Sequence, residues 1–348
     1  IEEFIILTQI IFIDIILAAD NAIIIGLILG TMFKPGDGID LSGVDPFTSG
    51  VASMSVAERL FGIIPMNPFA SLANGEVLPI IFFSILLGIG IIMGGEKTKP
   101  IGNFFSAAAE AVLKVAHMVM QVAPYGVLSL VAWVSGTMGL AALQNLLVLT
   151  LILYFGCLFH MVFVYGSLIR IFAKLPLKNF FRGILDAQAV AYSTSSSSAT
   201  LPVTLQCVQE NLGVKKTVAS SVLPLGATIN MDGTALYLGI VALFAAQIFG
   251  IDLSFTDYLL IAMTATLTSI GTAGIPSASL FLLATVLSVI GVSDEQTALI
   301  VGFVLPFDRI LDMARTAVNI TGDATVSVLV AKSENEIDED VFRENAVL

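Results

Sequence analysis

One face of a predicted helix near the carboxyl end of the chain gathers charged and polar side chains in an otherwise apolar segment. These side chains are Asp308, Asp312, Arg315, Asn319 and Asp323. Their spacing of three or four residues keeps them in one stripe of an α-helix, which turns by about 100° per residue. Residues 299–307 and 324–331 on either side are almost entirely apolar. Charges at bilayer depth are costly, so such a stripe indicates a substrate or ion pathway, with a structural ion pair as the alternative.

The composition indicates an integral membrane protein. Of the 348 residues, 57% are hydrophobic and only 12% are charged, and the mean hydropathy is +0.96, which excludes an ordinary soluble domain. Part of the formal charge of −12 lies in the acidic segment 334–340, which we interpret as a solvated charge run. Cys157, Cys207, His117 and His160 have no motif spacing, so they predict neither a disulfide framework nor a metal site.

Segments long enough to cross a bilayer of roughly 30 Å occur six times. They are residues 4–33, 77–95, 104–135, 142–172, 216–250 and 296–331. Two further apolar segments, 183–212 and 256–291, are interrupted at their centres by small and polar residues. We expect each to form a re-entrant helical hairpin that enters and leaves the membrane on the same side. Such interrupted pairs are typical of inverted-repeat transporters, so we expect an all-α, multi-pass membrane protein with halves at 183–250 and 256–331.

Basic residues lie beside segment ends that an alternating count places on one side of the membrane. They are Lys97, Lys99, Arg170, Lys174, Lys178, Arg182, Lys215, Lys216 and Lys332. The positive-inside rule makes this side cytoplasmic. We therefore expect a protein of the inner (plasma) membrane with both termini in the cytoplasm. The two hairpins then open toward opposite compartments, as alternating access requires.

The segment 216–250 contains a polar interruption, Asn230-Met231-Asp232-Gly233-Thr234. Asn, Asp and Gly in succession are poor helix formers, so we expect the helix to unwind here and to leave carbonyl oxygens free. Free carbonyls beside an aspartate would offer an oxygen-rich site to a small hard cation, with a simple kink as the alternative.

The polar residues of these helices carry a net negative charge. Asp232, Asp308, Asp312 and Asp323 against the single Arg315 leave a charge of −3 in a low-dielectric region. That charge requires bound cations or protons. The serine run 195–198 offers hydroxyl and N–H groups suited to a carboxylate. A matching substrate has a carboxylate for Arg315 and an ammonium for a nearby aspartate.

Four ordered motifs in the second half of the chain carry a family resemblance. They are SSSSATLP at 195–202, NMDGTALY at 230–237, SIGTAGIP at 269–276, and DMART at 312–316 followed by Asn319 and Thr321-Gly322-Asp323. With NPF at 67–69 and NGEVLP at 74–79, these motifs resemble the dicarboxylate/amino acid:cation symporters, the glutamate transporter family, over about residues 28–345.

The resemblance implies a homotrimer in which each substrate domain moves, elevator-like, against a static scaffold, with Na⁺ or H⁺ driving uptake. It divides the chain into an atypical first helix at 1–33, scaffold (trimerisation) helices at 46–137, a transport domain at 140–332 and an acidic cytoplasmic tail at 333–348.

The resemblance also implies a role for individual residues. Arg315 would bind the side-chain carboxylate of the substrate, Asp312 its ammonium, and Asp308 would steady the guanidinium. The remaining substrate-binding positions are Ser196, Ser197, Thr234, Ile275, Thr316 and Asn319. The Na⁺-binding positions are Gly226, Asn230, Asn319 and Asp323 for one ion, Thr228, Met231, Ser269, Ile270 and Thr272 for a second, and Asp232 nearby.

The Asp312–Arg315 pair resembles that of acidic amino-acid carriers, because a C4-dicarboxylate has no ammonium to offer Asp312. We therefore expect an aspartate or glutamate symporter coupled to Na⁺, with H⁺ as the alternative ion. The alternatives are a C4-dicarboxylate symporter, a rearranged or degenerate chain with impaired transport and, more remotely, a metal-ion exporter or a channel. Neither an enzyme nor a nucleic-acid-binding protein is expected.

Residues 1–27 depart from the family pattern. The sequence around Asp14, Asp20 and Asn21 weakly resembles the opening helix of TerC-type membrane proteins, which are associated with metal-ion export. The resemblance implies two further helices before this segment, and we expect this chain to lack them. We therefore expect the region before about residue 45 to be displaced, poorly packed or dependent on neighbouring protomers.

Overall fold

The computed structural model describes residues 20–39, 64–74, 77–122, 139–270 and 274–344, and single positions at 125, 126, 128, 129, 132, 136 and 272. Within these ranges every regular element is helical, apart from one isolated β-bridge between Val214 and Ile337. The predicted all-α class is therefore confirmed for the described residues. Asp14 and parts of the predicted scaffold, chiefly residues 46–63, lie outside them.

The described residues form a succession of α-helices. They are α2 (Asp20–Phe33), α4 (Pro68–Asn74), α5 (Val77–Gly94), α6 (Lys99–Met120), α8 (Gly139–Phe159), α9 (Leu177–Gly183), α10 (Leu185–Thr194), α11 (Ser197–Gln206), α12 (Lys216–Ile229), α13 (Asp232–Ile248), α14 (Phe255–Ile270), α15 (Ala278–Ser288), α16 (Asp294–Ser333) and α17 (Glu339–Glu344). A 3₁₀ turn at Gly95–Lys97 and π-helical segments at His160–Tyr165, Leu168–Ala173 and Cys207–Asn211 complete the described elements.

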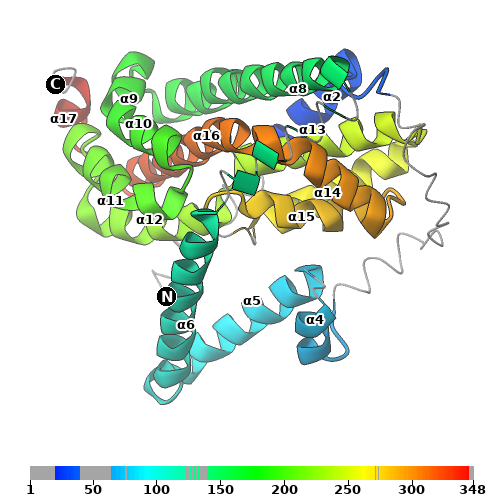
Figure 1. Ribbon diagram of the computed structural model, residues 1–348. Helices are drawn as coiled ribbons and strands as arrows, with labels where there is room; N and C mark the ends of the chain where they lie inside the picture. Colours follow the sequence, from blue (N-terminus) through cyan, green and yellow to red (C-terminus); the bar gives the residue numbers. More distant parts are fainter. Residues whose placement is uncertain are drawn as a thin grey trace.

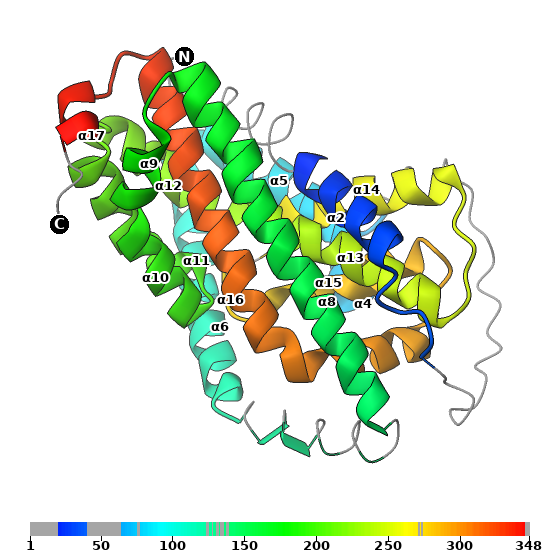
Figure 2. The same ribbon diagram turned by 90° about the horizontal axis from the view of Figure 1, so that it is seen from above.

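The 40-residue helix α16 runs through the middle of the main body (Figures 1 and 2). Helices α8, α10, α12, α13 and α15 all pack against it. Helices α4, α5 and α6 form an arm that projects from this body, and α5 touches α14 and α15. Within the described residues, three helical segments are long and apolar enough to cross a membrane: Leu78–Lys97, Gln144–Ala173 and Lys216–Ile248.

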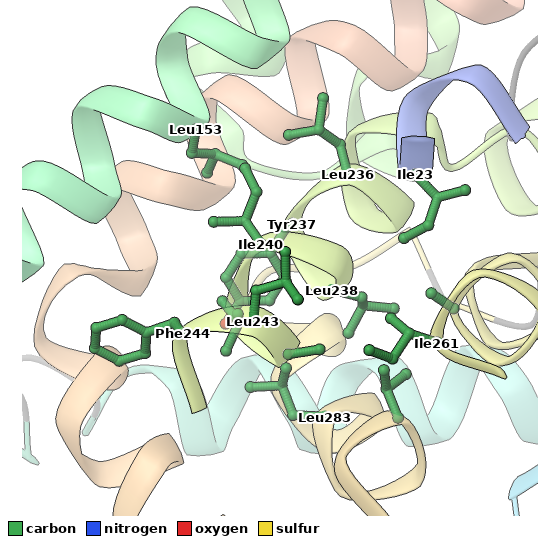
Figure 3. Close-up of a cluster of buried hydrophobic side chains, with 14 of the residues drawn as sticks. Ile23, Leu153, Leu236, Tyr237, Leu238, Ile240, Leu243, Phe244, Ile261 and Leu283 are labelled. Atoms are coloured by element: carbon green, nitrogen blue, oxygen red, sulfur yellow. The ribbon is translucent and has the colours of Figure 1, made fainter. Parts of the chain in front are cut away.

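Helix α13 lies at the centre of the largest hydrophobic cluster of the described residues. Every residue from Asp232 to Ala246 is buried. Figure 3 shows its apolar side chains surrounded by Ile23 of α2, Leu153 of α8 and further residues of α14 and α15. Because α13 is enclosed on all sides, it holds the polar residues at its amino-terminal end in fixed positions.

Helix α2 packs closely along α13, contrary to the part of the expectation that the region before about residue 45 is poorly packed. Ala22 and Ile23 are buried, and a Cβ at Gly26 would lie 2.6 Å from the backbone oxygen of Leu236. Beyond the helix, the Gly36 N–H donates to Oε1 of Gln247 at 2.8 Å. Poor packing is therefore wrong for residues 20–39, because small residues on α2 allow a close helix–helix approach that composition does not reveal.

The acidic tail is docked on the protein through Phe342, while the charged side chains of 334–340 stay exposed or partly exposed, as expected of a solvated charge run. Phe342 of α17 is fully buried in a second cluster with residues of α9 and α12. Backbone bonds join Lys215 N to Glu336 O at 2.9 Å and Asp338 N to Gly213 O at 2.8 Å. The charges face basic residues, since Lys215 pairs with Glu336 and Lys332 pairs with Glu339.

Candidate functional site

The serine run forms a sharp turn between α10 and α11, which lie side by side (Figure 1). Ser195 ends α10 in the left-handed region with φ of 55°. Ser196 caps α11, and its Oγ accepts a hydrogen bond from the Ala199 N–H at 3.1 Å. Small polar residues suit this turn, because serine satisfies the first N–H groups of a helix.

A second turn, between α14 and α15, meets the serine turn at Gly274. The Ser196 hydroxyl donates to the Gly274 carbonyl at 2.6 Å, and the Ser198 N–H donates to the same oxygen at 3.2 Å. A Cβ at Gly274 would lie 2.6 Å from Ser198 Oγ and 3.0 Å from the Ala227 oxygen. Glycine therefore permits the close contact between the two turns.

The polar interruption separates α12 from α13 at Asn230 and Met231. The Asn230 amide donates to Asp323 Oδ1 at 3.1 Å and to the Asn319 carbonyl at 3.3 Å. The Asn319 side chain accepts from the Gly233 N–H at 2.8 Å. Side chains of α16 thus satisfy part of the backbone and amide groups that the helix break leaves free.

A pocket opens where the two turns, the helix break and α16 come together. Its lining residues are Ser195, Ser197, Met231, Thr234, Thr272, Gly274, Ile275, Ala278, Ser279, Asp312, Thr316 and Asn319. Six of the eight positions predicted for the substrate are in this set, and Ser196 and Arg315 are not. The sequence interpretation did not name Gly274, Ala278 and Ser279 as substrate positions, although Gly274 lies within a motif that it had singled out and the other two follow it closely. Ser195 belongs to the serine run that it had considered suited to a carboxylate.

Arg315 lies behind the pocket in a buried charge cluster. Its Nη2 atom lies 2.8 Å from Asp312 Oδ1 and 3.1 Å from Asp308 Oδ1. The guanidinium carbon sits 4.0 Å from the centre of the Tyr237 ring, a cation–π contact that the sequence did not predict. Among the described residues, neither Arg315 Nη1 nor Asp308 Oδ2 has a hydrogen-bond partner.

Asp312 links this cluster to the second turn. While its Oδ1 faces Arg315, its Oδ2 accepts a hydrogen bond from the Ser277 N–H at 2.7 Å. Ser277 adopts φ of 60° and precedes α15. One carboxylate that lines the pocket therefore holds both the guanidinium and the start of α15.

Asp232 has two partners that the sequence did not indicate. Tyr165 donates its hydroxyl to Asp232 Oδ2 at 2.6 Å, and His160 Nε2 lies 3.4 Å from the same oxygen. Both partners belong to the π-helical segment after α8. On an ordinary α-helix, residues five apart would point about 140° away from each other, whereas π-helical hydrogen bonding brings them closer to one face.

The predicted cation residues divide into two groups. Asn230, Asn319 and Asp323 lie together at the helix break beside Gly226, where a Cβ would be 2.5 Å from Asp323 Oδ1. In the second group, Met231 and Thr272 line the pocket, and Ile270 is partly buried. Ser269 is buried and donates its hydroxyl to the Thr266 carbonyl. Thr228 is exposed and donates its hydroxyl to the Leu225 carbonyl.

Buried carboxylates and an arginine lie beside a pocket and pack against α8, α12 and α13, which belong to segments apolar enough to cross a membrane. This arrangement is typical of a membrane transporter. The chain belongs to the sodium:dicarboxylate symporter family, whose model matches residues 5–333. The predicted family is therefore confirmed. The match includes most of the segment 1–27 that resembles TerC-type proteins, on which the metal-exporter alternative depends.

The chain is similar to transport proteins for glutamate, aspartate and C4-dicarboxylates. The chain is 35% identical over 327 residues to the proton/sodium-glutamate symport protein of Geobacillus stearothermophilus, covering 92% of this chain and 76% of the relative. It is 37% identical over 328 residues to the proton/glutamate-aspartate symporter of Escherichia coli K12, covering 91% and 74%. It is 35% identical over 325 residues to a C4-dicarboxylate transport protein of Rhizobium johnstonii, covering 91% and 72%.

Proposed function

We propose that this protein is a secondary active symporter that takes up aspartate or glutamate together with Na⁺. The observation that carries the proposal is the Asp312–Arg315 pair at the pocket, in which Asp312 lines the pocket and Arg315 lies directly behind it. The two side chains offer one negative and one positive group to a ligand that carries both charges.

An acidic amino acid fits this pair better than a simple dicarboxylate. Arg315 Nη1 has no partner among the described residues, so it can donate to a ligand carboxylate after a small movement. Asp312 is a carboxylate that lines the pocket, and a ligand ammonium supplies it with a further positive donor. A C4-dicarboxylate leaves Asp312 without that donor and adds a second negative charge to a site that is already negative.

Coupling to a cation follows from the charges around the pocket. Among the described residues of this region, four buried aspartates, Asp232, Asp308, Asp312 and Asp323, face one buried arginine. Asn230 Oδ1 and Asp232 Oδ1 are buried and accept no hydrogen bond from described groups. Buried oxygens without donors suit Na⁺, and protonation of a carboxylate is the alternative way to lower the charge.

Transport would proceed by an elevator movement of the main body against a scaffold, in a homotrimer of the inner membrane with cytoplasmic termini. In this proposal α10–α11 and α14–α15 are the two re-entrant hairpins, and the break at Asn230–Met231 is the unwound part of the α12–α13 helix. The projecting arm supports a division into two parts, because α5 and α6 carry exposed apolar side chains such as Ile92, Met93 and Phe104. Lipid or neighbouring protomers would cover these side chains.

A C4-dicarboxylate:cation symporter is the second candidate, and the similarity to the Rhizobium johnstonii transporter favours it. The two candidates share the carboxylate site and differ only in whether Asp312 meets a ligand ammonium. A substrate panel therefore separates them.

Uptake into proteoliposomes tests the proposal. Purified protein is reconstituted, and uptake of radiolabelled L-aspartate, L-glutamate and succinate is measured with an inward Na⁺ gradient, with an inward H⁺ gradient and with neither. We expect concentrative, Na⁺-dependent uptake of L-aspartate or L-glutamate. Concentrative uptake of succinate alone would favour the dicarboxylate candidate, and uptake driven only by H⁺ would replace Na⁺ as the coupling ion.

A further inference from the structure

The Ser279 hydroxyl is a buried polar group that the proposed function leaves without a role. Ser279 is 3% exposed, and its Oγ has no hydrogen-bond partner among the described residues. The residue lines the pocket together with Asp312 and Thr316. Buried hydroxyls are normally satisfied, so an unsatisfied one that lines a pocket indicates a contact with a ligand.

The position of Ser279 indicates which chemical group of a ligand its hydroxyl contacts. It is the second residue of α15, which begins at Ala278. The Ser277 N–H is fixed on Asp312 Oδ2 at 2.7 Å, and this bond holds the start of α15 beside the charge cluster. The amino-terminal turn of a helix favours negative groups, because its N–H groups and dipole are positive there. A hydroxyl at this turn therefore faces an environment that suits a carboxylate.

Several neighbouring hydroxyls are already used for structure. Ser196 donates to the Gly274 carbonyl, Thr272 to the Thr268 carbonyl, and Ser269 to the Thr266 carbonyl. These bonds hold the two turns and the end of α14 in place. The Ser279 hydroxyl is available for a ligand because it does not contribute to them.

We infer that Ser279 is a specificity-determining residue whose hydroxyl donates a hydrogen bond to a carboxylate oxygen of the transported substrate. The inference rests on the proposed function, since it presumes an anionic ligand in this pocket. It adds a contact that is separate from Asp312 and Arg315. Ser279 therefore recognises the carboxylate of the substrate whether or not an ammonium is present.

Equilibrium binding of L-aspartate at saturating Na⁺ tests the inference. Isothermal titration calorimetry is applied to the purified full chain, to Ser279→Ala, to Ser279→Thr and to the matched control Ser288→Ala. Ser288 lies on the same helix, is exposed, and donates its hydroxyl to the Thr285 carbonyl. Thermal unfolding of each variant shows whether the fold is retained.

We expect Ser279→Ala to bind L-aspartate about 10- to 100-fold more weakly, as for the loss of a hydrogen bond to a charged group. Ser279→Thr, which keeps the hydroxyl, should bind more tightly than Ser279→Ala, and Ser288→Ala should match the unmodified chain. Ser279→Gly provides a second variant without the hydroxyl if the alanine variant does not fold.

Two results overturn the inference. One is unchanged L-aspartate affinity in a folded Ser279→Ala protein, which would make the hydroxyl merely structural. The other is an unchanged affinity at saturating Na⁺ with a higher Na⁺ requirement, which would make Ser279 a cation ligand. If the unmodified chain binds neither L-aspartate, L-glutamate nor succinate, the proposed function fails and the inference fails with it. Tight binding by the unmodified chain that Ser279→Ala leaves unchanged overturns the inference alone.

Discussion

Replacement of Arg315 by cysteine should impair both stability and substrate binding, for separable reasons. Arg315 is fully buried, and its Nη2 atom lies 3.1 Å from Asp308 and 2.8 Å from Asp312. Removing one partner of a buried ion pair costs about 3–5 kcal/mol, because the remaining charge is left uncompensated. Loss of the contact with the Tyr237 ring adds about 2 kcal/mol at a desolvated site.

A second variant separates the two effects. Arg315→Cys leaves the carboxylates of Asp308 and Asp312 without their counter-charge. The double variant Asp308→Asn/Arg315→Cys replaces the first of these carboxylates by a neutral amide. We expect this double variant to recover much of the unfolding temperature that Arg315→Cys loses. It should not recover L-aspartate binding, because neither protein has a guanidinium for the ligand carboxylate. The lost charge-assisted pair corresponds to at least about 100-fold in affinity.

The assays are thermal unfolding in detergent and calorimetric titration with L-aspartate at saturating Na⁺. Binding of a neutral amino acid is measured in parallel, since removal of the cation leaves room for an uncharged side chain. Undiminished L-aspartate affinity in Arg315→Cys would refute the assignment of Arg315 to the substrate carboxylate. Recovery of L-aspartate affinity in the double variant would show that Arg315 acts only by neutralising Asp308.

Three further perturbations follow from contacts elsewhere in the structure. Tyr165→Phe removes the hydroxyl that donates to Asp232 at 2.6 Å and should cost about 1.5–3 kcal/mol, seen as a lower unfolding temperature. Phe342→Ala removes a fully buried aromatic side chain and should weaken the docking of α17 by about 3–5 kcal/mol. We expect limited proteolysis to cleave α17 more rapidly in this variant. The pKa of Glu339 is lowered from 4.5, first by its hydrogen bond with Lys332. Docking of the tail should therefore be strongest above pH 4.5 and weaken modestly as the pH falls through the lowered pKa, measured by hydrogen exchange corrected for its intrinsic pH dependence.

Matched control variants show whether each effect depends on the contact to which it is assigned. Tyr258→Phe loses a more exposed hydroxyl, which lies 3.2 Å from Thr31, and should change the unfolding temperature little. An equal loss in Tyr258→Phe and Tyr165→Phe would contradict the role of the Asp232 contact. Glu344→Ala, at an exposed tail position, should leave proteolysis unchanged. In Glu339→Gln this acid-dependent weakening should disappear, and its persistence would place the titrating group elsewhere.

The sequence predicted those parts of the site that depend on local patterns. The stripe on α16 follows from helical periodicity, and all five of its members are buried in the structure. The turn at Ser195 and the break at Asn230 follow from residues that do not favour a continuous helix. These features need no knowledge of distant contacts.

The sequence did not predict contacts between residues far apart along the chain. His160 and Tyr165 approach Asp232 across more than sixty positions, by way of a π-helical segment without an obvious signature. Tyr237 stacks on Arg315, and Phe342 anchors a tail whose charges had indicated a solvated segment. Each of these contacts results from packing, which composition and periodicity do not specify.

The dependence of L-aspartate affinity on Na⁺ tests the proposed ion-coupled site most directly. The dissociation constant is measured by calorimetry across a Na⁺ series at constant ionic strength, for the unmodified chain and for Asp323→Asn. If Na⁺ and substrate share one conformational equilibrium, the affinity should rise steeply with Na⁺, because linkage between two ligands is reciprocal. Asp323→Asn should flatten this dependence. An affinity that is equal in Na⁺-free and Na⁺-rich buffer would contradict Na⁺ coupling and leave H⁺ as the driving ion.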